Sequence, residues 1–200
     1  MTAKRLTIGV GGAVILVLLV VGLAELSSSS PSQTRPSKLT LVQMRARLAG
    51  ASAPLASLHA QASELLPGGL TALRARLASL RGQPVVINKW ASWCVPCRSE
   101  FGAFQGASLA LGRRVAFIGV DSGDTSRAAG ASFLRSFPVS YPSYYDHSGA
   151  AGAAVTGSAF TPVTVFYDRS GSEYIRQGPY PSQARLEEDV RRYALGAKHA

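Results

Sequence analysis

Residues 86–101 read Val86-Ile-Asn-Lys-Trp-Ala-Ser-Trp-Cys-Val-Pro-Cys-Arg-Ser-Glu-Phe101, and this stretch decides the fold. It holds the only two cysteines of the chain, Cys94 and Cys97. Their spacing is too short for a disulfide that joins distant parts of a fold, and it suits two sulfurs that repeatedly form and break one bond with each other. The apolar residues 84–90 before them predict a buried strand, and residues 95–111 predict a helix.

The junction of this strand and helix gives the two sulfurs different roles. Cys94 begins the helix, where unpaired backbone N–H groups and the helix dipole favour a thiolate, so we predict that Cys94 is the nucleophile. Cys97, one turn further, is the predicted resolving thiol. The alternative is a fixed structural disulfide. The remaining metal-ligand candidates are the scattered His59, His147 and His199, so we expect no metal and no cofactor besides the Cys94–Cys97 disulfide.

The chain is strongly basic but its charges are dispersed. Its 200 residues carry 21 Lys and Arg against 11 Asp and Glu, a formal net charge of +10, and 46% are hydrophobic. The basic residues cluster only in pairs such as Arg113-Arg114, without a recognition motif, which favours a solvated basic surface near a membrane over nucleic-acid binding.

The N-terminal sequence predicts where in the cell the protein lies. Lys4 and Arg5 precede an uncharged apolar run from Leu6 to Ala24, close to the ~20 residues that span a bilayer as a helix. The positive-inside rule keeps Lys4 and Arg5 in the cytoplasm, so we predict a single-pass protein of the cell membrane with its catalytic domain extracytoplasmic. The alternative is a signal peptide cleaved before Glu25, which leaves the cysteines on the same side.

Four segments follow from composition and periodicity. Residues 1–26 are the predicted cytoplasmic tip and anchor, 27–38 a flexible linker, 39–81 a helical extension and 82–200 the main domain. In the main domain strands alternate with helices, which predicts an α/β sheet with helices on both faces. Further predicted elements are strands 115–121 and 141–145, helix 125–137 capped by Thr125 or Asp124, helix 149–156, a hairpin over 163–177 and a closing helix over 182–195 capped by Ser182.

The chain resembles the membrane-anchored thioredoxin-like thiol–disulfide oxidoreductases of bacteria, the TlpA/ResA/CcmG type. The resemblance rests on residues 86–101, on Ile118-Gly-Val-Asp121 and on Thr161-Pro-Val-Thr-Val-Phe166, and it covers roughly residues 82–195. It implies a thioredoxin-like fold, a central mixed sheet flanked by helices, with an N-terminal transmembrane helix. Residues 39–81 depart from the usual start of the family, which has a short strand hairpin there.

The resemblance also implies site residues. Glu100 corresponds to an acid that lies near the dithiol and influences its proton transfer, in contrast to a solvent-facing helix glutamate. Pro162 corresponds to a cis proline packed against the dithiol, in contrast to a trans proline of an edge strand, and Thr161 before it corresponds to a residue that binds substrate backbone. We expect Trp93 to shield the disulfide rather than fill the core. Lys89 stands where the family usually has Phe or Val, and either reaches the surface or brings a charge to the site.

These expectations together predict an enzyme that reduces or exchanges disulfides in exported proteins, restored by a membrane electron donor. Apocytochrome c is the best-known client of the family, which implies a possible role in cytochrome c maturation. Two alternatives stay open: an oxidase of exported thiols, if the reduced form is the more stable one, and a copper-binding chaperone of the same fold. Nucleic acid is not an expected partner.

Overall fold

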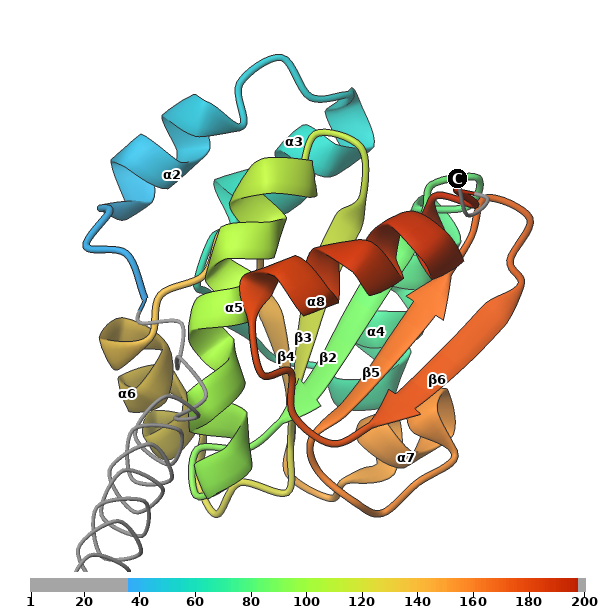
Figure 1. The fold of residues 1–200 in the computed structure, drawn as a ribbon. Helices are drawn as coiled ribbons and strands as arrows, with labels where there is room; N and C mark the ends of the chain where they lie inside the picture. Colours follow the sequence, from blue (N-terminus) through green and yellow to red (C-terminus); the bar gives the residue numbers. More distant parts are fainter. Residues whose placement is uncertain (1–35, 198–200) are drawn as a thin grey trace, which may run out of the picture. The chain divides into compact units, whose positions relative to one another are not determined.

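A computed structural model describes residues 36–197 of the chain (Figure 1). The predicted membrane span over residues 6–24 and most of the predicted linker lie outside this range. Within residues 36–197 no helix is both long and apolar enough to cross a membrane.

The centre of the molecule is one mixed six-stranded sheet, as the sequence predicts. The strand order is β1-β4-β3-β2-β5-β6, in which the first four strands run parallel, β5 runs antiparallel to β2, and β6 runs antiparallel to β5. The parallel strands all end at one edge of the sheet, so the loops that follow them are neighbours. The strands are β1 (Leu65–Leu66), β2 (Val85–Trp90), β3 (Ala116–Ser122), β4 (Ser143–Asp146), β5 (Val163–Tyr167) and β6 (Glu173–Gln177).

Eight helical segments flank this sheet in the described part of the chain. In Figure 1, α5 and α8 lie in front of the sheet and α4 and α7 behind it, which is the predicted two-faced arrangement. The segments are α2 (Leu41–Arg47), α3 (Ala53–Ala60), α4 (Gly69–Ser79), α5 (Val95–Leu111), α6 (Arg127–Ser136), α7 (Ala150–Thr156), α8 (Gln183–Asp189) and the π-helix η1 (Val190–Ala194).

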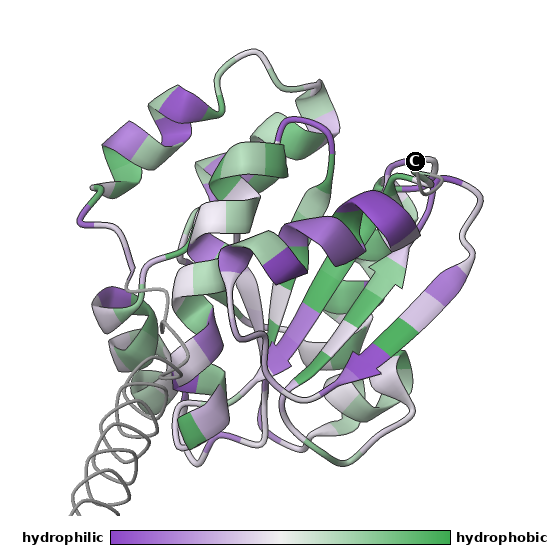
Figure 2. Ribbon diagram, viewed as in Figure 1, coloured by the Kyte–Doolittle hydropathy of each residue, from purple (hydrophilic) through white to green (hydrophobic). Residues whose placement is uncertain are grey.

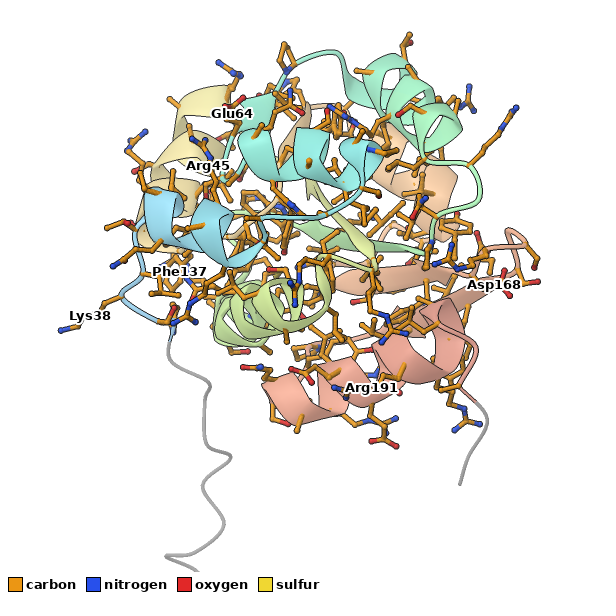
Figure 3. All side chains as sticks on the ribbon, turned by 90° about the horizontal axis from the view of Figure 1, so that it is seen from above. Lys38, Arg45, Glu64, Phe137, Asp168 and Arg191 are labelled. Atoms are coloured by element: carbon orange, nitrogen blue, oxygen red, sulfur yellow. A yellow bond between two sulfur atoms is a disulfide. The ribbon has the colours of Figure 1, made fainter. Side chains whose placement is uncertain are left out.

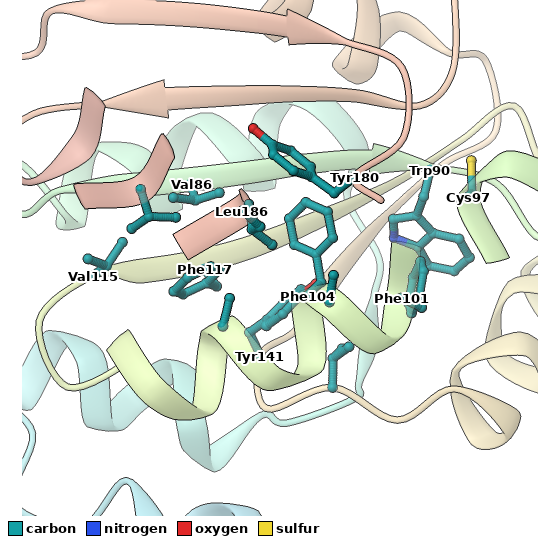
Figure 4. Close-up of a cluster of buried hydrophobic side chains, with 14 of the residues drawn as sticks. Val86, Trp90, Cys97, Phe101, Phe104, Val115, Phe117, Tyr141, Tyr180 and Leu186 are labelled. Carbon is teal, nitrogen blue, oxygen red and sulfur yellow. The ribbon is translucent and has the colours of Figure 1, made fainter. Parts of the chain in front are cut away.

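Strand β2 is buried on both faces, and its side chains alternate between two hydrophobic clusters. Val86 and Trp90 point into the cluster under α5 and α8, where Figure 4 shows Trp90 and Phe101 beside Cys97. Ile87 points into the second cluster, which α3, α4 and α7 cover. The alternation places Asn88 on the α5 face and Lys89 on the α7 face, and both are buried polar residues.

Two helices differ in detail from their predictions. Helix α6 begins at Arg127, and its cap is Ser126, whose side chain accepts the Ala129 N–H. The predicted caps Thr125 and Asp124 are therefore wrong, because the Asp124 carboxylate is occupied by Ser92. The closing helix is capped by Ser182 as predicted, but it continues beyond Asp189 as a π-helix.

Residues 39–81 form α2, α3, β1 and α4, and they pack onto the sheet. The capping box of Thr40 and Gln43 starts α2. Leu58 of α3 and Leu73 of α4 are fully buried in the second hydrophobic cluster, and β1 adds an edge strand beside β4. Figure 2 shows the result, with hydrophobic strands at the centre and hydrophilic residues on the outer helix surfaces.

The basic residues lie mainly at the surface. Lys38, Arg45 and Arg191, labelled in Figure 3, are exposed. The ion pairs within residues 36–197 involve only Arg176, Arg185 and Arg191, so most of the excess positive charge faces solvent.

Candidate active site

The two cysteines lie where β2 passes into α5. Cys94 is the N-cap residue of α5, with an extended backbone, and Cys97 lies in its first turn. The two form a disulfide with an S–S distance of 2.04 Å. The Cys97 N–H donates to the Cys94 sulfur at 3.2 Å, so a backbone donor of the helix start already points at the sulfur that would carry the charge.

Both sulfurs are largely shielded. Cys94 is 3% exposed and Cys97 is fully buried, so Cys94 is the sulfur nearer to solvent. Pro96 occupies the first turn of α5, where its missing N–H removes no helical hydrogen bond. The greater exposure of Cys94 suits its predicted role as the nucleophile, and the burial of Cys97 suits the predicted role of the resolving thiol.

Thr161 and Pro162 lie opposite the disulfide. The Thr161–Pro162 peptide bond is cis, which confirms the sequence expectation and excludes a trans edge-strand proline. The carbonyl oxygen of Thr161 is 3.9 Å from the Cys94 sulfur. Pro162 leads into β5, the antiparallel neighbour of β2, and this pairing brings residues 67 positions apart together.

Trp93 is a surface residue of the site. Its side chain is 59% exposed, and its indole N–H donates to the Gly123 carbonyl at 3.2 Å. An ordinary core role for Trp93 is therefore excluded, and Trp90 has that role. The indole is held by the loop after β3, beside the outward sulfur.

A cavity of about 590 Å³ lies beside Trp93 and Thr161, the two residues next to Cys94, and Phe160 and Lys89 also line it. Phe160 is 73% exposed, so two aromatic side chains stand at the surface next to Cys94. Lys89 is buried and donates to the Ser158 carbonyl at 2.6 Å. Burial lowers the pKa of the Lys89 amine, and the nearby Asp146 carboxylate partly offsets this effect. Of the two outcomes left open for Lys89, reaching the surface is excluded, because the side chain is buried and its amine is bonded to Ser158.

Glu100 is fully buried on the α5 face of the sheet, one turn beyond Cys97 on the same helix. One carboxyl oxygen accepts the Tyr180 N–H at 3.0 Å, and the other has no donor among the described residues. Burial raises the pKa of Glu100 to about 8, against the opposing effect of the Tyr180 N–H. A solvent-facing role for Glu100 is excluded.

Three residues around Glu100 were not found by sequence reasoning. Tyr180 precedes α8 and follows no motif, so nothing in the sequence points to its N–H. Asn88 lies in an apolar strand and belongs to no predicted site, yet its amide lowers the pKa of both Glu100 and Tyr141. The Tyr141 hydroxyl is buried, and burial together with the Glu100 charge raises its pKa. These groups form a polar cluster inside an otherwise apolar core.

Within residues 36–197 no group of three or more His, Cys, Asp or Glu side chains could hold a metal ion.

The sheet order, the disulfide at the start of α5 and the cis proline opposite it define a thioredoxin-like fold with a redox-active disulfide. The chain belongs to the AhpC/TSA family, which residues 56–172 match. This match includes α4 and part of α3, so it extends into the segment where the sequence departs from the resembled family.

The sequence is similar to those of curated thiol–disulfide oxidoreductases. It is 31% identical over 74 residues to the thiol-disulfide oxidoreductase ResA of Bacillus subtilis, which is 36% of this chain and 41% of that protein. It is 34% identical over 110 residues to the thiol:disulfide interchange protein DsbE of Allochromatium vinosum, which is 54% of this chain and 59% of that protein. The chain thus spans about half the length of the curated relatives it matches.

Solved structures give the same result. DsbF of Mycobacterium tuberculosis, in mixed oxidised and reduced forms, is 27% identical and superposes with a TM-score of 0.52 over 58% of this chain and 84% of that one. A secreted M. tuberculosis disulfide oxidoreductase homologous to E. coli DsbE is 26% identical, with a TM-score of 0.52 over 57% of this chain and 85% of that one.

Proposed function

We propose that this protein is a thiol–disulfide oxidoreductase that reduces or exchanges disulfides in exported proteins. The observation that carries the proposal is the Cys94–Cys97 disulfide itself: the outward sulfur caps a helix, and the carbonyl of Thr161 lies 3.9 Å from it. The similarity to ResA and DsbE supports the same activity.

The exchange proceeds in two steps. The Cys94 thiolate attacks one sulfur of a client disulfide, which forms a mixed disulfide and releases the other client sulfur as a thiolate. The Cys97 thiolate then attacks the Cys94 sulfur, which releases the second client thiolate and forms the Cys94–Cys97 disulfide. A dithiol of a membrane electron donor restores the reduced form by the same exchange.

Glu100 is the proposed proton acceptor for Cys97. Its pKa of about 8 leaves the carboxyl able to gain and lose a proton near neutral pH. As Cys97 becomes the attacking thiolate, the carboxylate takes its proton, and a neutral Glu100 also avoids a second negative charge beside a thiolate.

The proposed client surface is the rim of the cavity beside Cys94. The exposed aromatic rings of Trp93 and Phe160 offer apolar contact to the residues that flank a client cysteine. The backbone of Thr161 faces the sulfur, so an extended client segment can pair with it while its cysteine reaches Cys94.

The direct test is a trapping experiment. In Cys97→Ala the second step is blocked, so Cys94 should remain joined to its client and be recovered as a mixed disulfide from the cell envelope. The matched control is the Cys94→Ala, Cys97→Ala double variant, which should capture nothing. The proposal fails if the single variant captures no more than the double variant.

The proposed location is the outer side of the cell membrane, with residues 6–24 as a single anchor, and the proposed client class includes apocytochrome c. Support for the location comes from the apolar run after Lys4 and Arg5, and support for the client class comes from the resemblance of residues 86–101 to the TlpA/ResA/CcmG type. Protease added to intact protoplasts should remove the catalytic domain, while an internal cytoplasmic marker survives.

The proposed client class has a separate test. A peptide with an oxidised Cys-x-x-Cys-His segment should be reduced faster than a peptide with wider cysteine spacing. Equal rates would exclude this client preference.

A further inference from the structure

Two buried acids lie at the end of β3. Asp121 is the last but one residue of β3, and Asp124 lies in the loop that follows. Their exposures are 0% and 1%. The proposed exchange uses neither residue, and the sequence pattern assigned Asp124 only to a helix cap.

Asp124 holds the segment that leads into Cys94. Its carboxylate accepts the Ser92 N–H at 3.1 Å and the Ser92 hydroxyl at 2.7 Å. In the same loop, the Gly123 carbonyl accepts the Trp93 indole N–H. On the other side of the segment, the Arg98 guanidinium donates to the Ser92 carbonyl at 3.1 Å. The two residues before Cys94 are thus fixed by the loop after β3.

Asp121 has no hydrogen-bond donor of its own. Neither of its carboxyl oxygens has a partner among the described residues, although both are buried. Its carboxyl lies beside that of Asp124, and its pKa is raised to about 9 by burial and by Asp124. A proton on Asp121 removes the repulsion between the two buried carboxylates, because the Asp121 O–H can donate to an Asp124 oxygen.

No cation neutralises this pair in residues 36–197, because none of the ion pairs there includes either acid. Among the charged groups of neighbouring elements, Asp146 of β4 adds a further negative charge to the pair. Lys89 of β2 points to the opposite face of the sheet, where its amine is bonded to Ser158. His147 contacts the Asp124 backbone carbonyl at 3.0 Å, and the guanidinium of Arg127 donates to the Leu65 carbonyl.

Helix α6 is shaped to accept the Asp121 carboxyl. Gly130 packs against it, and a Cβ at that position would lie 2.0 Å from the carboxyl oxygen. The glycine leaves room for the acid and supplies no polar side chain to it. Asp124 is therefore the neighbour to which Asp121 can direct a proton.

We propose that Asp121 is a positioning residue of the active site, which in its neutral form donates a hydrogen bond to Asp124 and thereby holds Ser92, Trp93 and the start of α5. Loss of the proton places two carboxylates against each other in the interior, and their repulsion displaces Asp124 from Ser92. The effect of Asp121 on the reaction rate rests on the proposed exchange reaction. The dependence of the Asp124–Ser92 contact on the Asp121 proton does not, because it can be measured in the oxidised protein.

The test compares Asp121→Asn, whose amide can still donate to Asp124, with Asp121→Ala, which cannot. The matched control is Asp168→Asn, which changes an exposed acid. In the oxidised protein the cysteines do not titrate, so NMR of the Trp93 indole N–H and the Ser92 amide reports on the loop alone. We expect both signals to shift with a midpoint near pH 9 in wild type and in Asp168→Asn, and to stay constant in Asp121→Asn. The Glu100→Gln variant, measured alongside, should retain the shift.

In the reduced proteins we expect exchange with a model disulfide to fall roughly 10- to 100-fold in Asp121→Ala, because the nucleophile is misplaced, and to be retained in Asp121→Asn. A titration at pH 9 that persists in Asp121→Asn overturns the proposal, as does an Asp121→Asn rate as low as that of Asp121→Ala. If Asp121→Ala does not fold, the NMR titration of the Trp93 and Ser92 signals in Asp121→Asn still tests the proposal. If wild type shows no exchange at all, the proposed function fails, while the titration still tests Asp121.

Discussion

At the scale of single residues, the site combines one sulfur near solvent with acids that are kept out of water. Cys94 has the Cys97 N–H and the Thr161 carbonyl as neighbours, while Glu100 has a single backbone donor, from Tyr180. Because burial favours the neutral acid, the Glu100 proton is held until the pH approaches 8. The ionisation of this carboxyl and that of the thiols should therefore be coupled.

Replacing Glu100 with Gln tests this coupling. A charged Glu100 opposes a thiolate nearby, so in the reduced protein Glu100→Gln should alkylate at Cys94 faster than wild type above pH 8 and show a simpler pH profile. The measurement is the rate of iodoacetamide labelling between pH 5 and 10. The control is Glu64→Gln, which changes an exposed acid. Identical profiles for Glu100→Gln and wild type would remove Glu100 from the mechanism.

At the scale of elements, the start of a helix positions the reactive cysteine, and the parallel strands bring the loops around it to the same end of the sheet. Helix α5 starts at the cysteine itself, so the end of β2 and the helix dipole meet at the nucleophile. The loops after β3 and β4 lie at the same edge because these strands are parallel to β2. Helix α6 follows the β3 loop, and its start at Ser126 leaves Asp124 free to bind Ser92.

The assignment of the α6 cap is directly testable. Ser126→Ala removes the hydrogen bond to the Ala129 N–H, so we expect a loss of about 1 kcal/mol in the free energy of unfolding. Thr125→Ala changes the exposed neighbouring residue and should leave stability within about 0.5 kcal/mol of wild type. Urea titration of both variants measures the difference. The opposite ranking would restore Thr125 as the cap.

At the scale of the whole molecule, residues 39–81 are part of the folded core. Leu55 and Leu58 of α3 and Leu73 of α4 complete the hydrophobic cluster on the face of the sheet opposite α5. The disulfide belongs to the other cluster, under α5 and α8, so the two faces of the same sheet are each covered by a hydrophobic cluster.

Truncating a leucine of this segment should therefore destabilise the entire domain. Leu58→Ala leaves a cavity at a residue that is 1% exposed, so the expected cost is about 2–5 kcal/mol in a single cooperative transition. Val42→Ala, at a residue that is 73% exposed, should cost much less. Denaturant unfolding followed by both tryptophan fluorescence and circular dichroism checks this. Separate transitions for the two probes would show that the segment folds apart from the sheet.

The buried acids also set how stability depends on pH. A carboxyl whose pKa is higher in the folded state than in the unfolded state binds its proton more tightly when folded. Its favourable contribution is full below the unfolded pKa and is lost as pH rises towards the folded pKa. For Glu100 these limits are 4.5 and about 8, and for Asp121 they are 3.8 and about 9.

We therefore expect the oxidised protein to lose stability as pH rises from 5 to 8, with each of the two acids contributing up to about 1.4 kcal/mol per pH unit. Glu100→Gln should reduce this slope, and so should Asp121→Asn, while Glu64→Gln should not. The free energy of unfolding in urea at several pH values measures it. A slope unchanged in both buried variants would show that these carboxyls are not protonated in the folded protein.

The sequence by itself determined the redox pair, the strand before it and the helix after it, because these follow from local patterns: an apolar run, a Cys-x-x-Cys spacing and a helix start. Alternation of strands and helices was enough for an α/β sheet with two covered faces, and the resemblance to a known family implied that the sheet is mixed. The resemblance to a known family also gave the cis Thr161–Pro162 bond correctly, and the Thr161 carbonyl lies 3.9 Å from the Cys94 sulfur. The role of Glu100 in proton transfer stays a prediction.

Only the tertiary structure decided which partner each buried polar group has. Tyr180 reaches Glu100 across 80 positions, and Asp124 binds Ser92 across 32 rather than capping its own helix. Lys89 ends in the cavity beside Cys94, and Asp121 meets a second acid instead of a cation. Such partners depend on which loops strand pairing brings to one edge of the sheet, and burial then requires those polar groups to satisfy one another. No local pattern contains this information, because the contacts join residues that are distant along the chain.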